Sequence, residues 1–232
     1  LYEDRSILAV DKPAGWMLAP SDWDRTGRNL QLALTASIGS GDFWARSRNL
    51  KFLRFIHRLD AETTGVLLWA KSAGAVPIYS RLFETRAVEK SYYAIAEGSA
   101  AQEQWTVRSP IASDPSHPVR MRIDPSGRDA VTNFSVVNRT GDRLLVRANP
   151  VTGRTHQIRV HLQKSGLPIL GDQLYGSRTK SPAADYPFAL RAASLTYPDP
   201  FSRRKITVSA PMDRFLKAFG FAAEDSTPPR TA

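Results

Sequence analysis

Cysteine is absent from the 232-residue sequence, which excludes disulfide bonds, thiolate nucleophiles, iron–sulfur clusters and cysteine-based zinc sites. No run of apolar residues reaches the length of about 18 that a membrane-spanning helix needs. The opening residues, L-Y-E-D, bring acidic groups where a signal peptide would place an apolar segment. We therefore expect a protein that stays away from membranes, in a reducing compartment such as the cytoplasm.

Signatures of nucleotide and acyl chemistry are also missing. The chain has no G-x-x-x-x-G-K-[ST] loop, no G-x-G-x-x-G and no G-x-S-x-G. It has only four histidines. His156 and His161 are five positions apart, so they point about 140° apart on a helix and to opposite faces on a strand. Neither geometry lets both rings bind one ion, so we expect no metal site.

The charge balance is strongly basic. Lysine and arginine together number 32 against 22 acidic residues, which gives a formal net charge of +10. Such an excess favours a polyanionic partner, above all a nucleic acid. No acidic residue lies between Asp42 and Asp60, and several arginines alternate there with aromatic residues. The alternative is that the charge serves solubility alone.

Short apolar runs separated by turn residues predict many strands and few helices. We expect strands at 6–10, 53–56, 66–70, 88–96, 131–137, 143–148, 190–197 and 205–209, and helices at 30–38, 76–86, 211–220 and from Thr155. Turn residues at 138–142 and 198–200 predict two hairpins. This pattern is typical of an α+β fold with a mainly antiparallel sheet. We expect one domain over 1–222 and a flexible polar tail over 223–232.

The stretch R-F-I-H-R-L-D-A-E-T-T-G at 54–65 is charged although it lies between two apolar runs. Asp60 lies among Arg54, His57 and Arg58, and neighbouring cations favour its ionised form. An ionised Asp60 can act as a nucleophile or a base, but not as an acid. A salt-bridged turn without a catalytic role fits this segment equally well.

A second polar stretch, G-R-T-H-Q-I-R-V-H-L, occupies 153–162. The i, i+4 spacing of Ile158 and Leu162 predicts a short helix, with Gly166 as its C-cap. The cations of this stretch can pair with Asp60 or with phosphates. A solvated basic helix is the alternative interpretation.

Together these two stretches resemble the signature motifs of the RluA family of RNA pseudouridine synthases. Four further segments fit the family in the same order: D-R-S-I-L-A-V-D-K-P-A-G at 4–15, K-S-Y at 90–92, G-D-Q-L-Y-G at 171–176 and L-R-A-A-S-L-T-Y-P-D-P at 190–200. The resemblance covers almost the whole chain. Each motif is short, but six of them in the same order are specific.

The resemblance implies a reaction and a fold. The family isomerises selected uridines of RNA to pseudouridine without a metal ion or an organic cofactor. Its fold is α+β, with a mixed, mostly antiparallel sheet, flanking helices and a central active-site cleft. The implied partner is a structured stem-loop of rRNA or tRNA, and we expect the protein to be a monomer.

The resemblance also implies roles for particular residues. Asp60 matches the catalytic aspartate, Tyr92 the active-site tyrosine that stacks on the uracil, and Arg159 the basic residue that pairs with the aspartate. Arg58 matches an arginine associated with displacing the target base. Two sets complete the expected site: RNA-binding Arg54 and Arg154, and the supporting residues His57, Thr64 and His156.

Some positions depart from the family pattern. Thr64 stands where serine is usual, which keeps the hydroxyl, and Arg191 stands where a histidine is common. These departures leave the identity of the RNA and of the target uridine open. They do not change the expected reaction.

Two rival functions remain open from the sequence. One is a non-catalytic RNA-binding protein derived from such enzymes. The other is a hydrolase of the glycosidic bond, with Glu62 or Glu89 as a second carboxyl group about 5–9.5 Å from Asp60. Binding without any change in the RNA distinguishes the first rival, and release of free uracil distinguishes the second.

Overall fold

The computed structural model describes residues 1–18 and 27–222. The chain divides into two compact units, each of which is built from two segments. The first unit comprises Leu1–Val88 with Ser194–Ala210, and the second comprises Glu89–Ala193 with Pro211–Ala232. The expected tail at 223–232 lies outside the described residues.

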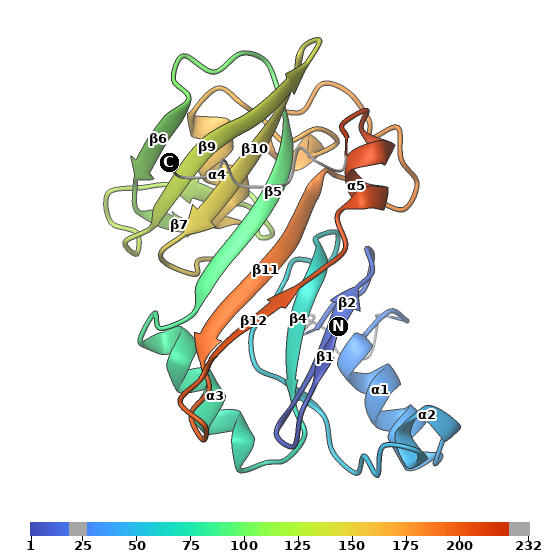
Figure 1. The fold of residues 1–232 in the computed structure, drawn as a ribbon. Coiled ribbons are helices and arrows are strands. Elements are labelled where there is room, and N and C mark those ends of the chain that lie inside the picture. The colour runs from blue at the N-terminus through green and yellow to red at the C-terminus, as the bar shows by residue number, and fades with distance from the viewer. Residues whose placement is uncertain (19–26, 223–232) are drawn as a thin grey trace. The chain divides into compact units, whose positions relative to one another are not determined.

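In the described part of the first unit, short antiparallel strands are accompanied by the helices α1, α2 and α3 (Figure 1). Its elements are β1 (Tyr2–Glu3), β2 (Ile7–Lys12), α1 (Leu30–Gly39), α2 (Phe43–Arg46), β3 (Arg54–Phe55), β4 (Thr64–Ala70), α3 (Ala75–Glu84), the second half of β11 (Leu190–Pro198) and β12 (Lys205–Ser209). Strand β4 pairs antiparallel with β2 and β3, β1 pairs with β2, and β11 pairs with β12. Every residue of β4 is buried, as its almost wholly apolar sequence T-G-V-L-L-W-A predicts.

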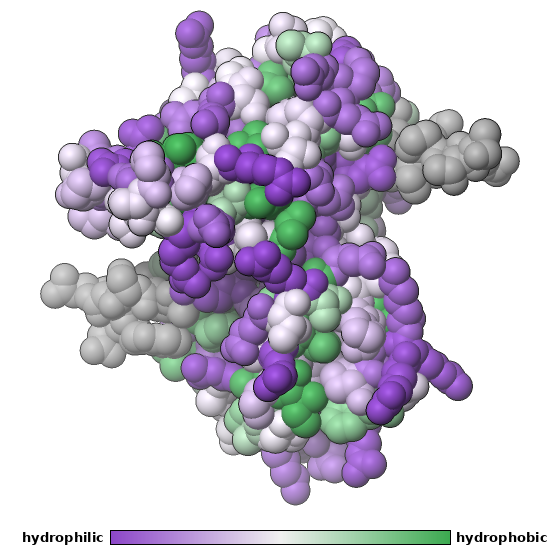
Figure 2. All heavy atoms as spheres, turned by 90° about the vertical axis from the view of Figure 1, so that its left-hand side faces the viewer, coloured by the Kyte–Doolittle hydropathy of each residue, from purple (hydrophilic) through white to green (hydrophobic). Residues whose placement is uncertain are grey.

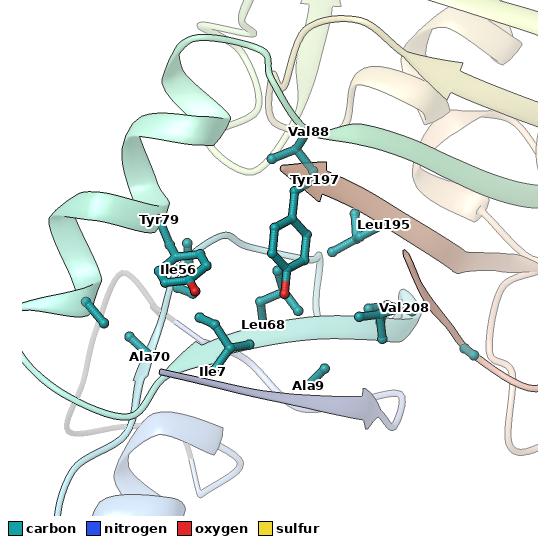
Figure 3. Close-up of a cluster of buried hydrophobic side chains, with 13 residues drawn as sticks. Ile7, Ala9, Ile56, Leu68, Ala70, Tyr79, Val88, Leu195, Tyr197 and Val208 are labelled. Atoms are coloured by element: carbon teal, nitrogen blue, oxygen red, sulfur yellow. The ribbon is translucent and has the colours of Figure 1, made fainter. Parts of the chain in front are cut away.

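The core of the first unit lies where β2, β4, α3, β11 and β12 meet. Figure 3 shows Ile7 and Ala9 of β2 beside Leu68 and Ala70 of β4, with the ring of Tyr79 above them. The rings of Tyr79 and Tyr197 lie edge to face, with centroids 6.0 Å apart. Alternate residues of β2 are buried, which is the period expected of a strand with one covered face.

The second unit contains the larger set of paired strands. Its elements are β5 (Glu89–Glu97), β6 (Gln104–Arg108), β7 (Ile111–Ser113), β8 (Met121–Ile123), β9 (Val131–Thr140), β10 (Arg143–Pro150), α4 (Gln157–Lys164), the 3₁₀ helix η1 (Gln173–Tyr175), the first half of β11 and α5 (Asp213–Ala218). Strands β5, β10, β9 and β6 lie side by side in that order, all antiparallel (Figure 1). Strands β7 and β8 form a separate hairpin, and α4 packs against β9 and β10.

The expected α+β class with mostly antiparallel strands is confirmed. Both predicted hairpins are present, as β9–β10 and β11–β12. The helix expected from Thr155 begins two residues later, at Gln157, because His156 adopts a left-handed conformation with φ of 55°. The C-cap of this helix is Ser165 rather than Gly166. The sequence did not predict β1, α2, β6, β7, β8 or η1.

The visible surface does not form one large apolar area. On the face shown in Figure 2, hydrophobic residues lie in small areas among hydrophilic ones. The large hydrophobic residues exposed within the described ranges are scattered along the sequence: Leu1, Leu32, Phe43, Ile78, Val119, Val151 and Phe201. Within these ranges no helix combines the length and the hydropathy needed to span a membrane.

Candidate active site

The segment that carries Asp60 is a loop between β3 and β4, fastened to the turn after β2. The antiparallel register places Lys12, the last residue of β2, opposite Gly65 at the start of β4. The two loops therefore leave the sheet side by side. The Gly15 amide donates to the Ala61 carbonyl at 2.9 Å, and the Thr63 amide donates to the Asp60 carbonyl at 3.1 Å. These bonds fix the backbone at Asp60 and at the residue that follows it.

Lys12 is the residue that ties these two loops together. Its side chain is fully buried, and its Nζ donates to the carbonyl oxygens of Pro13 at 2.8 Å and Ala61 at 2.7 Å. Burial lowers the pKa of Lys12 to about 8, while the nearby carboxylates of Glu62 and Asp60 act in the opposite direction. A buried cation beneath the loop contributes positive potential where Asp60 is attached.

His57 and Thr64 lie at the two ends of this loop. Nε2 of His57 accepts a hydrogen bond from the Leu68 amide at 3.1 Å, and the imidazole ring stacks on Phe83 at 4.7 Å. Because Nε2 is an acceptor, it carries no proton in this arrangement. The hydroxyl oxygen of Thr64 is buried without a hydrogen-bond partner among the described residues. These contacts are compatible with the supporting roles expected for both residues, which remain predictions.

Two of the expected RNA-contacting arginines lie on the surface, Arg54 on β3 and Arg58 within the loop itself. Arg54 and Arg58 are both exposed, as expected of cations that meet a phosphate backbone. The guanidinium of Arg54 lies over the partly buried ring of Phe55, with Cζ 5.1 Å from the ring centroid.

In the second unit, Tyr92 lies on β5 and is 8% exposed. Lys90 begins the K-S-Y motif, and its Nζ donates to the Thr152 carbonyl at 2.8 Å. The side-chain nitrogen of Asn149, on β10, donates to the Lys90 carbonyl at 3.1 Å. These bonds connect the strand of Tyr92 to the end of β10 and to the loop that leads into α4. The two stretches that looked separate in the sequence, K-S-Y and G-R-T-H-Q-I-R, are therefore neighbours.

Arg159 lies on α4 and has a partner that the sequence did not predict. Its Nε and Nη2 donate to the two carboxylate oxygens of Asp172, at 2.6 and 2.8 Å. Both side chains are buried in the second unit, whereas Asp60 belongs to the first. The expected pairing of Arg159 with Asp60 stays a prediction.

A buried chain of hydrogen bonds holds the start of α4. The side-chain oxygen of Gln157 accepts from the Thr152 hydroxyl at 2.6 Å and from the Arg154 amide at 3.0 Å. Its side-chain nitrogen donates to the Val131 carbonyl and to the Thr132 hydroxyl, both at 2.9 Å. Arg154 itself donates from Nε to the Asp129 carbonyl at 2.9 Å. The expected RNA contact of Arg154 stays a prediction.

The same chain of bonds ends at His161, which is fully buried. Nε2 of His161 contacts the Ser109 carbonyl at 3.1 Å, and Nδ1 contacts the Thr132 hydroxyl at 2.9 Å. A carbonyl only accepts, so Nε2 carries the proton and Nδ1 accepts from the hydroxyl. Burial lowers the pKa of His161 below its usual value of 6.5, although the Ser109 carbonyl opposes this effect.

Acid is therefore expected to destabilise the second unit through His161. Because the folded pKa lies below 6.5, the unfolded chain binds more protons as the pH falls below 6.5. Relative to His161→Gln, wild type should lose free energy of unfolding over this range, by at most about 1.4 kcal/mol per pH unit. Denaturant unfolding at pH 7.5, 6.5 and 5.5 measures the difference. His117→Gln, which replaces an exposed histidine, is the control. If the free energy of unfolding depends on pH in the same way in wild type and His161→Gln, the prediction is contradicted.

His156 has an unusual backbone for a β-carbon-bearing residue. Its φ of 55° and ψ of 19° place it in the left-handed region, immediately before α4. Its Nδ1 lies 2.8 Å from the hydroxyl of Tyr175, and the two rings meet edge to face. A strained residue held by a specific partner is a common feature of functional sites. Its expected supporting role remains a prediction.

Lys12, Asp172 and Tyr175 were not assigned a role from the sequence. All three lie in segments that carry the family resemblance, K-P-A-G and G-D-Q-L-Y-G, so the only sequence signal was their place in a motif. A lysine in a turn cluster is normally exposed, and Asp172 is 13 positions from its partner. Among the described residues, no group of three or more histidines and acidic residues is placed to hold a metal ion.

Comparison with known proteins gives consistent results. The family described as RNA pseudouridylate synthase matches residues 6–164. An uncharacterized RNA pseudouridine synthase of Bacillus subtilis, YhcT, is 36% identical over 94% of this chain and 69% of its own length. The dual-specificity RNA pseudouridine synthase RluA of Vibrio cholerae is 34% identical over 94% of this chain and 84% of its own length.

Other relatives are longer than this chain, and solved structures share its fold. The ribosomal large subunit pseudouridine synthase C of Vibrio cholerae is 32% identical over 94% of this chain, which spans 66% of that relative. The structure of human RNA pseudouridylate synthase domain containing 4 superposes with a TM-score of 0.73 at 26% identity, covering 94% of this chain and 90% of that chain. The family match includes Asp60, Tyr92 and Arg159 and ends before Asp172.

Proposed function

Since this chain belongs to the RNA pseudouridylate synthase family, we propose that it converts selected uridines of ribosomal or transfer RNA into pseudouridine, with Asp60 as its catalytic carboxylate. The observation that carries this assignment is the placement of Asp60. The aspartate lies in a loop whose next carbonyl, that of Ala61, accepts bonds from both the Lys12 ammonium and the Gly15 amide. A carboxylate on a fixed backbone is pre-organised to stabilise positive charge as it develops.

The reaction conserves all atoms of the nucleotide. The bond from C1′ to N1 of uracil breaks, the base rotates while still bound, and C5 bonds to C1′. The hydrogen on C5 then leaves as a proton, and N1 gains one. The separating sugar has oxocarbenium character, which a nearby carboxylate stabilises electrostatically or by covalent attack.

The remaining expected residues have complementary tasks in this proposal. Tyr92 stacks on the uracil, and Arg159 pairs with Asp60. Arg58 displaces the target base, which costs a few kcal/mol of unstacking unless the uridine is already unpaired. Arg54 and Arg154 bind RNA phosphates. His57, Thr64 and His156 hold the site.

The proposal also covers the setting of the reaction. We assign the activity to one catalytic domain over residues 1–222 that acts as a monomer in the cytoplasm. The substrate is a structured stem-loop, because a uridine in a loop is already unpaired and exposed arginines such as Arg54 and Arg58 can contact the phosphates beside it.

Tritium release tests the proposed reaction directly. Total RNA labelled at C5 of uracil is incubated with the protein, and tritium in water is counted, because forming the new carbon–carbon bond expels this hydrogen. Release without free uracil is the expected result. Free uracil would instead indicate the hydrolase, and tight binding with no release from any RNA would indicate a binding protein.

RNA affinity is expected to fall steeply with salt if arginines neutralise phosphates. The logarithm of the association constant should fall linearly with the logarithm of salt concentration, and Arg54→Gln should reduce that slope by about 1. Filter binding between 50 and 300 mM KCl measures the slope. Arg5→Gln, which removes an exposed arginine near the N-terminus, is the matched control, and equal slopes for Arg54→Gln and wild type would remove Arg54 from the interface.

A further inference from the structure

We propose that Asp172 and Tyr175 are positioning residues that clamp the guanidinium of Arg159 for catalysis. This inference rests on the proposed function, because it takes Arg159 as the cation that acts with Asp60. It adds residues for which sequence motifs indicated no chemistry. Both lie beyond the end of the family match at residue 164.

The first part of the clamp is a buried, two-pronged ion pair. The Nε–Oδ2 distance is 2.6 Å and the Nη2–Oδ1 distance is 2.8 Å. Arg159 is 7% exposed and Asp172 is 2% exposed. A bidentate bond of this kind fixes the plane of the guanidinium as well as its position.

The second part of the clamp is aromatic. The guanidinium carbon of Arg159, Cζ, lies 4.8 Å from the ring centroid of Tyr175 and 4.8 Å from that of Phe188. With the carboxylate at one edge and rings within cation–π distance, a long and flexible side chain loses most of its rotamer freedom. We assign the guanidinium fixed in this way to the reacting centre.

The G-D-Q-L-Y-G motif is built to hold the two clamp residues together. Asp172 and Tyr175 are three positions apart across η1, where side chains at i and i+3 lie on the same side. The Tyr175 amide donates to the Asp172 carbonyl at 3.1 Å. Gly171 has a φ of 86°, and a β-carbon there would lie 2.4 Å from the Pro187 carbonyl oxygen, so the turn accepts only glycine.

The Tyr175 hydroxyl ties the clamp to two other segments. It accepts a hydrogen bond from the Met121 amide of β8 at 2.8 Å, and it pairs with Nδ1 of His156 at 2.8 Å. The ring is 1% exposed. The strained backbone of His156 and the start of α4 are thus fixed by the residue that packs on the guanidinium.

A fixed cation can lower the barrier of the reaction because it needs no rearrangement as charge develops. The rival explanation is that the ion pair only stabilises the fold. A purely structural role predicts lower stability with kcat of the folded protein little changed. A residue that acts through Arg159 lowers kcat, and has no further effect on kcat once Arg159 is removed.

The test is a cycle of four proteins: wild type, Asp172→Asn, Arg159→Ala and the double variant. At saturating RNA, Asp172→Asn should lower kcat for tritium release by about 100-fold, with KM within about threefold of wild type. The double variant should be no slower than Arg159→Ala. Glu103→Gln, which removes the carboxylate of the exposed pair with Arg139, is the matched control and should keep wild-type kcat.

Two results would overturn the proposal: a folded Asp172→Asn with kcat within threefold of wild type, or losses that multiply in the double variant. If Asp172→Asn does not fold, Tyr175→Leu decides the matter in its place, since it removes the ring of the second proposed residue and keeps the ion pair. Its loss of kcat should likewise disappear once Arg159 is replaced by alanine.

An NMR measurement separates failure of the clamp from failure of the proposed function. The Nε–H resonance of Arg159, assigned by its loss in Arg159→Lys, should exchange slowly with water in wild type and rapidly in Asp172→Asn. If wild type releases no tritium from any RNA, the proposed function fails, while this resonance still reports whether Asp172 fixes the guanidinium. Unchanged exchange in Asp172→Asn would overturn the clamp itself.

Discussion

Asp60→Asn is expected to reduce tritium release at least about 10³-fold, while RNA affinity stays within about threefold of wild type. Asparagine keeps the size of the side chain but cannot stabilise an oxocarbenium-like sugar with a full negative charge. The Asp60 carbonyl, which accepts from the Thr63 amide, belongs to the backbone and survives the substitution. Loop geometry is therefore retained, and the loss measures the carboxylate alone.

Glu62→Gln is the matched control for Asp60→Asn. Glu62 is the other carboxylate of the loop, and like Asp60 it acts on the Lys12 ammonium. It should retain tritium release within about threefold of wild type, since only the hydrolase hypothesis gives it a chemical role. Equal release by Asp60→Asn and wild type would mean that another carboxylate does the chemistry.

Elements with a clear period could be predicted from the sequence. The β9–β10 hairpin followed from two alternating runs around N-R-T-G-D, although pairing continues to Thr140 and the turn is tighter than expected. Helix α3 was expected at 76–86 and runs over Ala75–Glu84, with Tyr79 as its most buried side chain. Short strands such as β7 and β8 were not predicted, because three residues carry too little periodicity.

For the candidate site, the sequence predicted which residues take part but not which residues they contact. Asp60 was apparent as an acid among cations, and Arg159 as a cation in a motif. The pairing of Arg159 with Asp172 and its contacts with the rings of Tyr175 and Phe188 depend on how the chain after α4, residues 165–188, folds back against this helix. No local sequence pattern encodes that path. Lys12 was hidden for a similar reason, because its burial depends on the register between β2 and β4.

Lys12→Met is expected to impair catalysis although Lys12 does not act on the substrate itself in the proposed mechanism. Methionine has similar length and an apolar end, so it fills the site but cannot donate to the carbonyls of Pro13 and Ala61. The Asp60 loop then loses its buried attachment, and displacement of a reacting group by about 1 Å can cost about 100-fold in rate. We expect a loss of kcat of that size with RNA affinity little changed.

Lys71→Met is the matched control for this activity loss. Lys71 follows the other end of β4 and also uses Nζ to bind a carbonyl, that of Asp4 at 2.7 Å. Lys71 lies at the end of β4 that is farther from the Asp60 loop. Its neighbour Ala70 pairs with Ile7 at the start of β2, whereas Lys12 pairs with Gly65 next to the loop. Activity should therefore remain near wild type in Lys71→Met, and equal losses in the two variants would indicate a general effect on the fold.

Lys12→Met should also change how the free energy of unfolding depends on pH. In the folded protein the pKa of Lys12 is lowered to about 8 from its ordinary 10.5, so the unfolded chain binds more protons between these values and stability rises with pH across this window. Lys12→Met has no ammonium group that titrates at this position. Wild type should therefore gain about 2 kcal/mol of unfolding free energy over Lys12→Met between pH 8 and 10. Comparing the two proteins cancels the tyrosines that also titrate at high pH, and a constant difference in urea unfolding would mean that Lys12 is not held in a buried, desolvated site.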